Sequence, residues 1–355
     1  MGEQIDLIGL SEVAEMFGVS RQVVANWRSR YADFPGPLAE LKGGPVWQRR
    51  DMVAWADHNK VPLRGAERAE STEEGERMAI TTALVNMKGG VGKSTIAANL
   101  GWYCAQRRNK RVLLVDLDPQ FNLSQYILGV AGYEAIVNAG HKTTLHIFEQ
   151  FTPSVVSGVP KTELNPSDVI KNVRTWRDGS IMDLVPSHLD LAWTLKNPHA
   201  KERLLNDFLD EIRGNYDLIL IDCPPTESML TTAAYLASDY ILVPVRPEFL
   251  STIGLPLLVR SLTEFAGIYK KTVDLAGILF NATGDKREHQ LSRIYVAKIA
   301  MERNWYLFKN EISYSDSYSK GSRLGRPIFS TDYARYSKRA NFAAVADEFI
   351  GRIGL

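Results

Sequence analysis

The stretch "LVNMKGGVGKST", residues 84–95, decides the fold of this chain. An apolar run, "ITTALVNM", leads into its glycines, and a helical pattern, "STIAANLGWYCAQRR", follows them. Glycines let backbone N–H groups close around a phosphate, and the positive end of the helix dipole favours the same negative charge. The sequence therefore predicts a strand, a phosphate-binding loop and a helix in direct succession.

Each residue type in the predicted loop suits phosphate binding. Lys93 is expected to reach the β and γ phosphates of ATP, and Ser94 is expected to ligate Mg²⁺. The glycines permit a close approach of the backbone to the phosphates. The predicted nucleotide-binding residues of the loop are Lys88, Gly89, Gly90, Val91, Gly92, Lys93, Ser94 and Thr95.

The loop departs from the usual phosphate-binding pattern at one position. The pattern G-x-x-x-x-G-K-[ST] requires glycine at position 87, where this chain has Met87, and a second lysine, Lys88, follows. "KGGVGKST" resembles the deviant Walker A motif of the ParA/MinD family of ATPases. The resemblance implies that Lys88 crosses a dimer interface and contacts the nucleotide of the other subunit. It also implies that Lys88 and Lys93 both act in catalysis, Lys93 on the phosphates bound by its own loop. The alternative is that Lys88 is a solvated loop charge.

Two further strand ends carry carboxylates that resemble motifs of the same family. "VLLVDLDPQFN" places Asp116 and Asp118 after one apolar run, and "YDLILIDCPPT" places Asp222 after another. The resemblance implies that Asp118 is catalytic and positions the attacking water, whereas Asp116 and Asp222 join Ser94 on the metal side. It also assigns Gln120 and Asn122 to a switch loop. Strand-end aspartates can instead cap helices.

Asn281 ends another apolar run, in "GILFNATGD". An amide beyond the carboxyl end of a strand can both donate to and accept from adenine, and the family has an asparagine at a similar place. We therefore expect Asn281 to contact the base of ATP. The alternative is an asparagine that forms a turn.

Six apolar runs alternate with helical patterns in the larger part of the chain. They are too continuously apolar for half-solvated strands, so they predict a doubly wound α/β fold, with a mostly parallel sheet covered by helices on both faces. The charged stretch "VPLRGAERAESTEEGER" precedes them and is typical of a linker. We expect a front domain at 1–62, a linker at 63–78 and an ATPase domain at 79–355.

Composition limits the function classes. The 355 residues carry a formal net charge of only +1, so DNA binding must be argued from local patches. The two cysteines, Cys104 and Cys223, lack the spacing of a metal site or a disulfide framework, which favours a reducing cytosol. We see neither a signal peptide nor an apolar run long enough to span a bilayer. The expected location is cytoplasmic and associated with the nucleoid, without a membrane.

The last helical pattern, "NFAAVADEFIGRIGL", bears on membrane binding, which MinD-like members achieve with a basic terminal helix. Its apolar face consists of Phe342, Val345, Phe349 and Ile353, but its polar face is acidic. We therefore expect this helix to pack on the sheet.

The segment before that helix, residues 308–340, contains more basic than acidic residues, interleaved with Tyr and Ser. This composition suits contacts with the phosphates of any DNA, and the resemblance to ParA proteins implies the same role. The alternative is a solvated face. The predicted contacts are Lys309, Lys320, Arg323 and Arg326.

The first 60 residues predict a helix-turn-helix. "IGLSEVAEMFGVSRQVVANWRSR" gives one helix from Ser11 and a second that Ser20 caps, with Val24 and Trp27 pointing inward. A hairpin at residues 43–44 and a helix from Asp51 then resemble a winged, MerR- or excisionase-like domain. The alternative is a domain for dimerisation or for a protein partner. The predicted DNA contacts are Arg21, Gln22, Asn26, Arg28, Arg30 and, on the wing, Lys42 and Arg49.

Together these motifs predict a weak Mg²⁺-dependent ATPase that partitions DNA as an ATP-dependent homodimer. The resemblance implies a ParB-like centromere-binding adaptor as the activating partner, with nonspecific DNA bound by the ATPase domain and a specific site bound by the front domain. The alternatives are an ATP-switched protein that positions a protein cargo, or a transcriptional regulator.

Overall fold

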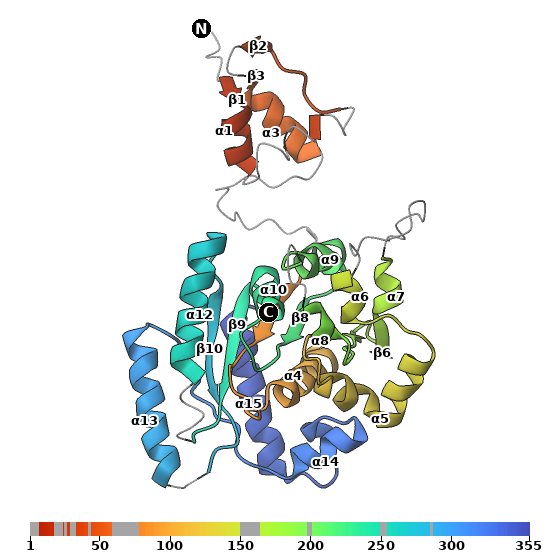
Figure 1. The fold of residues 1–355 in the computed structure, drawn as a ribbon, viewed down its shortest axis with the longest axis vertical. Coiled ribbons are helices and arrows are strands. Elements are labelled where there is room, and N and C mark those ends of the chain that lie inside the picture. The colour runs from red at the N-terminus through yellow and green to blue at the C-terminus, as the bar shows by residue number, and fades with distance from the viewer. Residues whose placement is uncertain are drawn as a thin grey trace. The chain divides into compact units, whose positions relative to one another are not determined.

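The structure of the chain is a computed structural model that describes residues 7–17, 24, 27–28, 33–41, 44–58, 78–149, 164–196, 201–248, 254–284 and 287–355. The chain divides into two compact units, Met1–Glu74 and Gly75–Leu355, both drawn in Figure 1. The expected linker, residues 63–78, lies outside the described residues except for Met78.

The front unit contains a three-stranded antiparallel sheet in the order β1-β3-β2. Its described elements are β1 (Leu7–Gly9), α1 (Leu10–Phe17), β2 (Ala39–Leu41), β3 (Gly44–Gln48) and α3 (Arg49–His58). Leu41 pairs with Gly44, so β2 and β3 form the predicted hairpin. The last helix begins at Arg49, two residues before the position that the sequence predicted.

The core of the front unit contains several aromatic rings that contact one another. The rings of Phe17 and Trp27 lie 5.4 Å apart, and those of Trp27 and Trp55 lie 5.6 Å apart. Val24 is fully buried, so Val24 and Trp27 point inward as predicted. Most of the predicted second helix, residues 20–30, lies outside the described residues.

The second unit is built on a seven-stranded sheet in the order β10-β9-β4-β8-β5-β7-β6. The strands are β4 (Ile80–Leu84), β5 (Arg111–Asp116), β6 (Lys171–Thr175), β7 (Ile181–Val185), β8 (Leu218–Asp222), β9 (Tyr240–Val245) and β10 (Asp274–Phe280). The six predicted apolar runs form the six parallel strands. The seventh strand, β6, was not predicted and pairs antiparallel with β7 at the edge.

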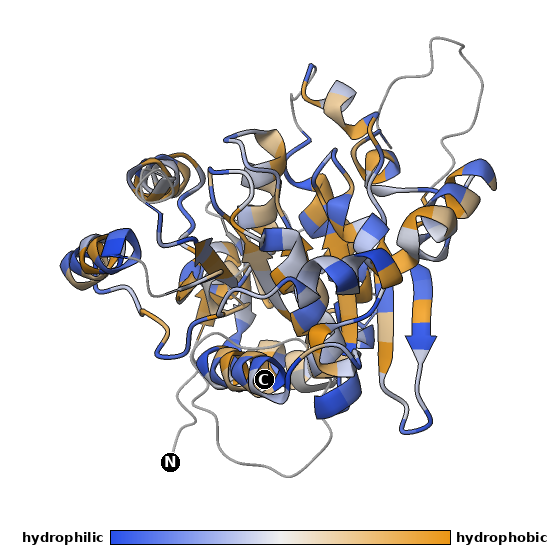
Figure 2. Cartoon of the chain, turned by 90° about the horizontal axis from the view of Figure 1, so that it is seen from below, coloured by the Kyte–Doolittle hydropathy of each residue, from blue (hydrophilic) through white to orange (hydrophobic). Residues whose placement is uncertain are grey.

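Helices cover both faces of this sheet, as predicted. Within β5, Val112 and Leu114 belong to one buried cluster, whereas Leu113 and Val115 belong to the other, because successive side chains of a strand point to opposite faces. Figure 2 shows hydrophobic strands between helices that turn polar residues outward. One cluster includes residues of α4 (Lys93–Arg108), α5 (Asn122–Asn138) and α15 (Tyr336–Ile353). The other includes residues of α6 (Thr144–Glu149), α8 (Leu191–Thr194), α9 (Leu204–Ile212), α10 (Met229–Ala237), α12 (Gly254–Tyr269) and α13 (Arg287–Glu302).

Shorter helical segments complete the described part of this unit. They are α7 (Pro166–Val169), the 3₁₀ turns Arg213–Asn215 and Ile328–Ser330, and α14 (Ser317–Leu324), which packs on α5. The terminal helix α15 buries Phe342, Val345, Phe349 and Ile353 against the sheet, as predicted. None of the helices that the structure describes is long and apolar enough to cross a membrane.

Strand order brings the predicted site residues together. β8 lies between β4 and β5, and Asp222 at its end is in register with Leu84 on one side and Asp116 on the other. Because these strands are parallel, the loops that follow them emerge at the same edge of the sheet. The phosphate-binding loop therefore meets the carboxylates that follow β5 and β8.

Candidate nucleotide-binding site

The phosphate-binding loop joins β4 to α4 through two left-handed glycines. Gly90 has φ of 74° and Gly92 has φ of 97°, conformations that a side chain disfavours. Gly92 directly precedes α4, so the loop leads into the amide-bearing end of that helix. A cavity of about 550 Å³ opens over the loop, a size that suits a nucleotide. It is lined by Gly89, Gly90, Gly92, Lys93, Ser94, Thr95, Asp118, Gln120, Asn122, Gln125, Tyr126, Val130, Pro225, Ser322 and Arg323.

Lys93 lies almost fully buried beneath the loop. Its ammonium donates hydrogen bonds to the backbone carbonyls of Asn86, at 3.2 Å, and Lys88, at 3.5 Å. Burial lowers the pKa of Lys93, and nearby groups led by Asp222 oppose that shift. The phosphate oxygens of a bound nucleotide would be charged acceptors and therefore stronger than these carbonyls. We therefore expect the Lys93 ammonium to turn towards the phosphates when a nucleotide binds.

The two remaining loop positions, Lys88 and Val91, differ from the others. Neither is among the residues that line the cavity. The backbone N–H of Lys88 donates to Asn86 Oδ1 at 2.9 Å, and its side chain is partly exposed. The Val91 side chain is buried, and its carbonyl accepts a hydrogen bond from Asn281. Val91 therefore contributes to the loop's shape rather than to the cavity surface.

Asn86 is a structural residue of the site that the sequence interpretation missed. Its Nδ2 donates to the Pro244 carbonyl at the end of β9, at 2.7 Å, while its Oδ1 accepts from Lys88. Asn86 thus ties the beginning of the loop to the neighbouring strand. An asparagine directly after an apolar strand was the only signal in the sequence.

The two aspartates that follow β5 have different positions. Asp118 lines the cavity, and its Oδ1 accepts from the Gln120 backbone N–H at 3.0 Å. Asp116 is fully buried: its Oδ1 accepts from the Asp118 N–H at 3.1 Å, and its Oδ2 accepts from both the N–H and the hydroxyl of Ser124. Asp116 therefore holds the loop and caps the start of α5, and the capping alternative applies to this residue.

The electrostatics of Asp116 follow from the same burial. Burial and the charge of Asp222 raise the pKa of the Asp116 carboxyl well above its usual range, although the hydrogen bonds from Ser124 act in the opposite direction. Because protein donors contact both of its carboxylate oxygens, Asp116 is poorly suited to ligate a metal directly.

Asp222 is buried beside the loop without such partners. Neither of its carboxylate oxygens accepts a hydrogen bond from the residues that the structure describes. Burial raises the pKa of Asp222 to about 7, and the Ser94 hydroxyl and the Lys93 ammonium oppose that rise. A carboxylate with orphaned oxygens next to a serine hydroxyl fits a hydrated Mg²⁺ ion. Ser94 and Asp222 are the residues that would hold it.

Asn281 closes the site from the side of β10. Its Nδ2 donates to the Val91 carbonyl at 2.8 Å, and its Oδ1 accepts from the Ala282 N–H at 2.8 Å. Asn281 also lines a second hollow of about 200 Å³, which shares Gly90 and Thr95 with the main cavity. The amide therefore clamps the loop and borders a space that adjoins the phosphate site.

Comparisons with known proteins agree with this geometry. Residues 79–275 match the family described as AAA domain. The chromosome partitioning protein ParA of Caulobacter vibrioides is 30% identical over 272 residues, which cover 76% of this chain and 93% of that protein. The chain belongs to the ParA-type AAA family.

Two solved structures share the fold of the ParA-type unit. One is an ATP complex of a Cyanothece McdA variant, with a TM-score of 0.64 and 18% identity, covering 79% of this chain and 98% of that one. The other is a putative plasmid partition protein from Borrelia burgdorferi bound to AMPPNP, with a TM-score of 0.59 and 21% identity, covering 77% of this chain and 99% of that one.

The predicted DNA contacts of the ParA-type unit do not form one group. Lys309, Lys320 and Arg326 are exposed and do not line the nucleotide cavity. The Lys320 ammonium lies 5.5 Å from the centre of the Tyr333 ring. Arg323, by contrast, lines the nucleotide cavity. Nothing in the sequence indicated this position, because basic composition alone cannot distinguish a nucleotide's phosphates from those of DNA.

Few of the predicted contacts of the front unit can be located. Arg28 forms an ion pair with Glu40 at 2.7 Å, so one predicted contact is joined to an acidic neighbour. Arg49 lies at the start of α3, with Nη1 4.0 Å from the Met16 sulfur. The other predicted contacts, Arg21, Gln22, Asn26, Arg30 and Lys42, lie outside the described residues.

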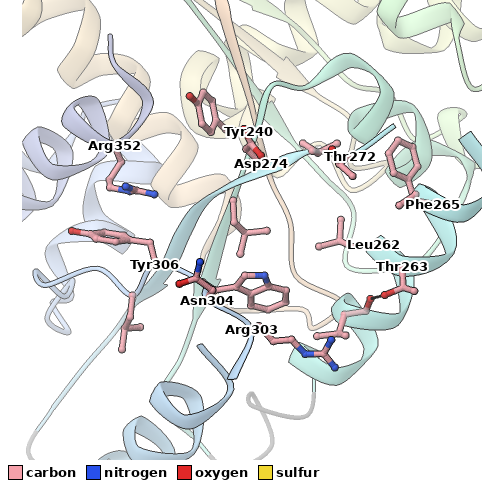
Figure 3. A pocket seen from close by; sticks show the side chains of 16 residues that line it. Tyr240, Leu262, Thr263, Phe265, Thr272, Asp274, Arg303, Asn304, Tyr306 and Arg352 are labelled. Atoms are coloured by element: carbon pink, nitrogen blue, oxygen red, sulfur yellow. Dashed lines mark hydrogen bonds between the residues drawn. The ribbon is translucent and has the colours of Figure 1, made fainter. Parts of the chain in front are cut away.

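A larger hollow, of about 1120 Å³, lies at the other end of the strands (Figure 3). It is bordered by Tyr240 and Asp274, where β9 and β10 begin, whereas the nucleotide cavity lies beyond the ends of strands. Tyr306 and Arg352 lie at one side of it and Phe265 at the other. None of the predicted site residues lines this hollow.

Proposed function

We propose that the chain is a Mg²⁺-dependent ATPase that partitions DNA. The observation that carries the proposal is the cavity over the phosphate-binding loop, beside which Lys93, Asp118 and the orphaned carboxylate of Asp222 converge. The similarity to a protein named chromosome partitioning protein ParA supports the partitioning role. The fold shared with a putative plasmid partition protein bound to AMPPNP supports ATP as the nucleotide.

The residues of the site divide the work of hydrolysis. Lys93 and the loop amides bind the β and γ phosphates, and Asp118 orients the attacking water. Ser94 and Asp222 hold Mg²⁺, which neutralises negative charge on the phosphates when it is bound. Asp116 acts indirectly, because its hydrogen bond fixes the backbone of Asp118. The adenine is assigned to the hollow that Asn281 lines.

Lys88 acts in a dimer. Lys88 belongs to the phosphate-binding loop but does not line the cavity of its own subunit, which supports a role towards a second copy of the chain. In the proposed ATP-dependent homodimer, the Lys88 ammonium contacts the nucleotide of the partner subunit. Two phosphate groups that face each other at such an interface need additional cations.

Each unit has a proposed role in DNA binding. The exposed residues Lys309, Lys320 and Arg326 bind phosphates of nonspecific DNA. The front unit is proposed to be a winged helix-turn-helix that binds a specific site, a role supported by the β2–β3 hairpin flanked by α1 and α3. A ParB-like adaptor stimulates hydrolysis, and the protein acts in the cytoplasm on the nucleoid.

The test compares the parent with Lys88→Ala and Lys93→Ala in the presence of a slowly hydrolysed ATP analogue. Lys88→Ala should bind the analogue as a monomer because Lys93 and the loop amides remain, whereas Lys93→Ala should lose nucleotide affinity. Light scattering measures the dimer, and calorimetry measures binding. A Lys88→Ala protein that dimerises and hydrolyses ATP like the parent would show that Lys88 is a surface charge.

A further inference from the structure

Part of the wall of the nucleotide cavity comes from α14, far along the chain from the phosphate-binding loop. Arg323, in the last turn of α14, lines the cavity together with Asp118 and Gln120. Arg323 is exposed, and no carboxylate within the described ranges forms an ion pair with it. An arginine without an ion-pair partner among the described residues therefore borders the cavity in which the phosphates are proposed to bind.

Close packing fixes α14 on α5. A Cβ on Gly321 would lie 2.6 Å from the Arg326 carbonyl oxygen and 3.2 Å from Tyr126 Oη, so a side chain at this position would clash. Gly325 ends α14 in the left-handed conformation, with φ of 62°, where its Cβ would lie 3.3 Å from the Ile127 carbonyl oxygen. The position of Arg323 at the cavity is thus set by a tight helix contact and not by a loose loop.

Hydrogen bonds join the same segment to α4. Asn99 of α4 donates from Nδ2 to Tyr126 Oη at 3.0 Å and accepts at Oδ1 from the Ile328 N–H at 2.8 Å. Tyr126 Oη in turn lies 3.4 Å from the Arg326 carbonyl oxygen, to which it donates. Since α4 begins at the phosphate-binding loop and α5 follows the loop of Asp118, the α14 segment is held by both phosphate-facing parts of the cavity.

We infer that Arg323 binds the phosphate groups of the nucleotide, so that the basic C-terminal segment senses the bound nucleotide directly. The inference rests on the proposed ATP site. Guanidinium groups pair with phosphate oxygens through two parallel N–H···O bonds, which lysine cannot reproduce. Arg323 is thereby removed from the set of DNA contacts, whereas Lys320 and Arg326, which do not line the cavity, stay in it.

The experiment measures binding to the full-length protein by titration calorimetry, with Mg²⁺ and either a slowly hydrolysed ATP analogue or AMP. Arg323→Gln should weaken binding of the ATP analogue about tenfold to a hundredfold, the usual effect of losing a charge-assisted hydrogen bond. Arg323→Lys should give an intermediate loss. Binding of AMP, which lacks the β and γ phosphates, should change little.

Arg335→Gln is the matched control. Arg335 is an exposed arginine of the same segment that does not line the cavity, so its loss removes the same charge without touching the site. Arg335→Gln should bind the analogue like the parent. Equal losses in Arg323→Gln and Arg335→Gln would indicate a general charge effect and overturn the inference.

Lys93→Ala distinguishes a failure of the proposed Arg323 role from a failure of the proposed ATP site. If Lys93→Ala loses the analogue while Arg323→Gln binds it like the parent, the ATP site stands and the role of Arg323 is wrong. If Lys93→Ala also binds the analogue like the parent, the proposed ATP site itself fails.

Discussion

Replacing Gly92 by alanine tests the contact between the phosphate-binding loop and Asn281. A Cβ at position 92 would lie only 2.2 Å from Asn281 Nδ2, whereas a Cβ on Gly90 would meet no atom within 4 Å. Both glycines are left-handed, so each alanine costs roughly 1–2 kcal/mol of backbone strain. Gly90→Ala is therefore a control that shares the strain but not the clash.

Gly92→Ala has an additional cost, because the Asn281 amide must move away from the new Cβ. That movement breaks its 2.8 Å hydrogen bond to the Val91 carbonyl. A hydrogen bond of this kind contributes about 0.5–1.5 kcal/mol, so Gly92→Ala should destabilise the ATPase unit by about 1 kcal/mol more than Gly90→Ala. For a unit of this size, that difference lowers the melting temperature by about 2 °C.

Scanning calorimetry of the full-length protein without nucleotide measures these differences. The same two alanine variants are then made in an Asn281→Ala background, which lacks the amide that a Cβ at position 92 would contact. The excess cost of Gly92→Ala should disappear there. If Gly92→Ala and Gly90→Ala are equally destabilising, or if the excess survives without the Asn281 amide, the proposed contact does not determine the need for glycine.

Two further predictions concern the carboxylates. Asp118→Ala should bind ATP with nearly the parent's affinity but lose turnover, because it removes the residue assigned to the water and leaves the phosphate-binding loop intact; a coupled phosphate-release assay at saturating ATP measures this, and parental turnover would exclude the role. Asp222→Asn should weaken the Mg²⁺ dependence of ATP binding and also stabilise the nucleotide-free protein at pH 8. The folded-state pKa of about 7 lies above the ordinary value, so the charged form opposes folding above pH 7, and this effect vanishes as the pH falls towards 4. Urea unfolding between pH 5 and pH 8 should show the difference in unfolding free energy between variant and parent growing up to about pH 7 and then levelling off, and a difference that is constant from pH 5 upwards would contradict the assignment.

The sequence predicted the sheet well because six strands are buried on both faces. Such strands are continuous apolar runs, and their order among helical patterns is visible in a single chain. The missed strand, β6 (Lys171–Thr175), has the opposite character: it lies at the sheet edge, and its residues are partly or fully exposed. Its sequence, "KNVRT", has no apolar run, so only pairing with β7 makes it a strand.

The site residues that belong to a complete sequence motif could be predicted. Those that reach the site from a distant segment of the chain could not. The loop and Asp118 are close to each other only through strand order, but their motifs are each complete in the sequence. Arg323 reaches the cavity because Gly321 and Gly325 allow α14 to pack closely on α5. That contact depends on tertiary packing, for which a basic segment gives no signal.

The distinction between Asp116 and Asp222 shows how hydrogen bonding separates residues that a motif treats alike. Both carboxylates are fully buried at adjacent strand ends, and burial raises the pKa of each. Asp116 accepts hydrogen bonds from Asp118 and Ser124, so its buried charge is compensated within the fold. Asp222 accepts no hydrogen bond of good geometry from the described residues, and only the Ser94 hydroxyl and the Lys93 ammonium oppose the rise in its pKa. A poorly compensated buried carboxylate destabilises the protein.

A protein can retain the destabilising effect of a buried carboxylate when a bound ligand removes that effect. The groups that oppose the rise in the Asp222 pKa are the Ser94 hydroxyl and the Lys93 ammonium, both from the phosphate-binding loop. A hydrated divalent cation bound with the nucleotide would add hydrogen-bond donors and further positive charge beside the Asp222 carboxylate. The unsatisfied carboxylate therefore makes nucleotide binding and the stability of this unit interdependent, whereas the satisfied Asp116 contributes to the shape of the site in either state.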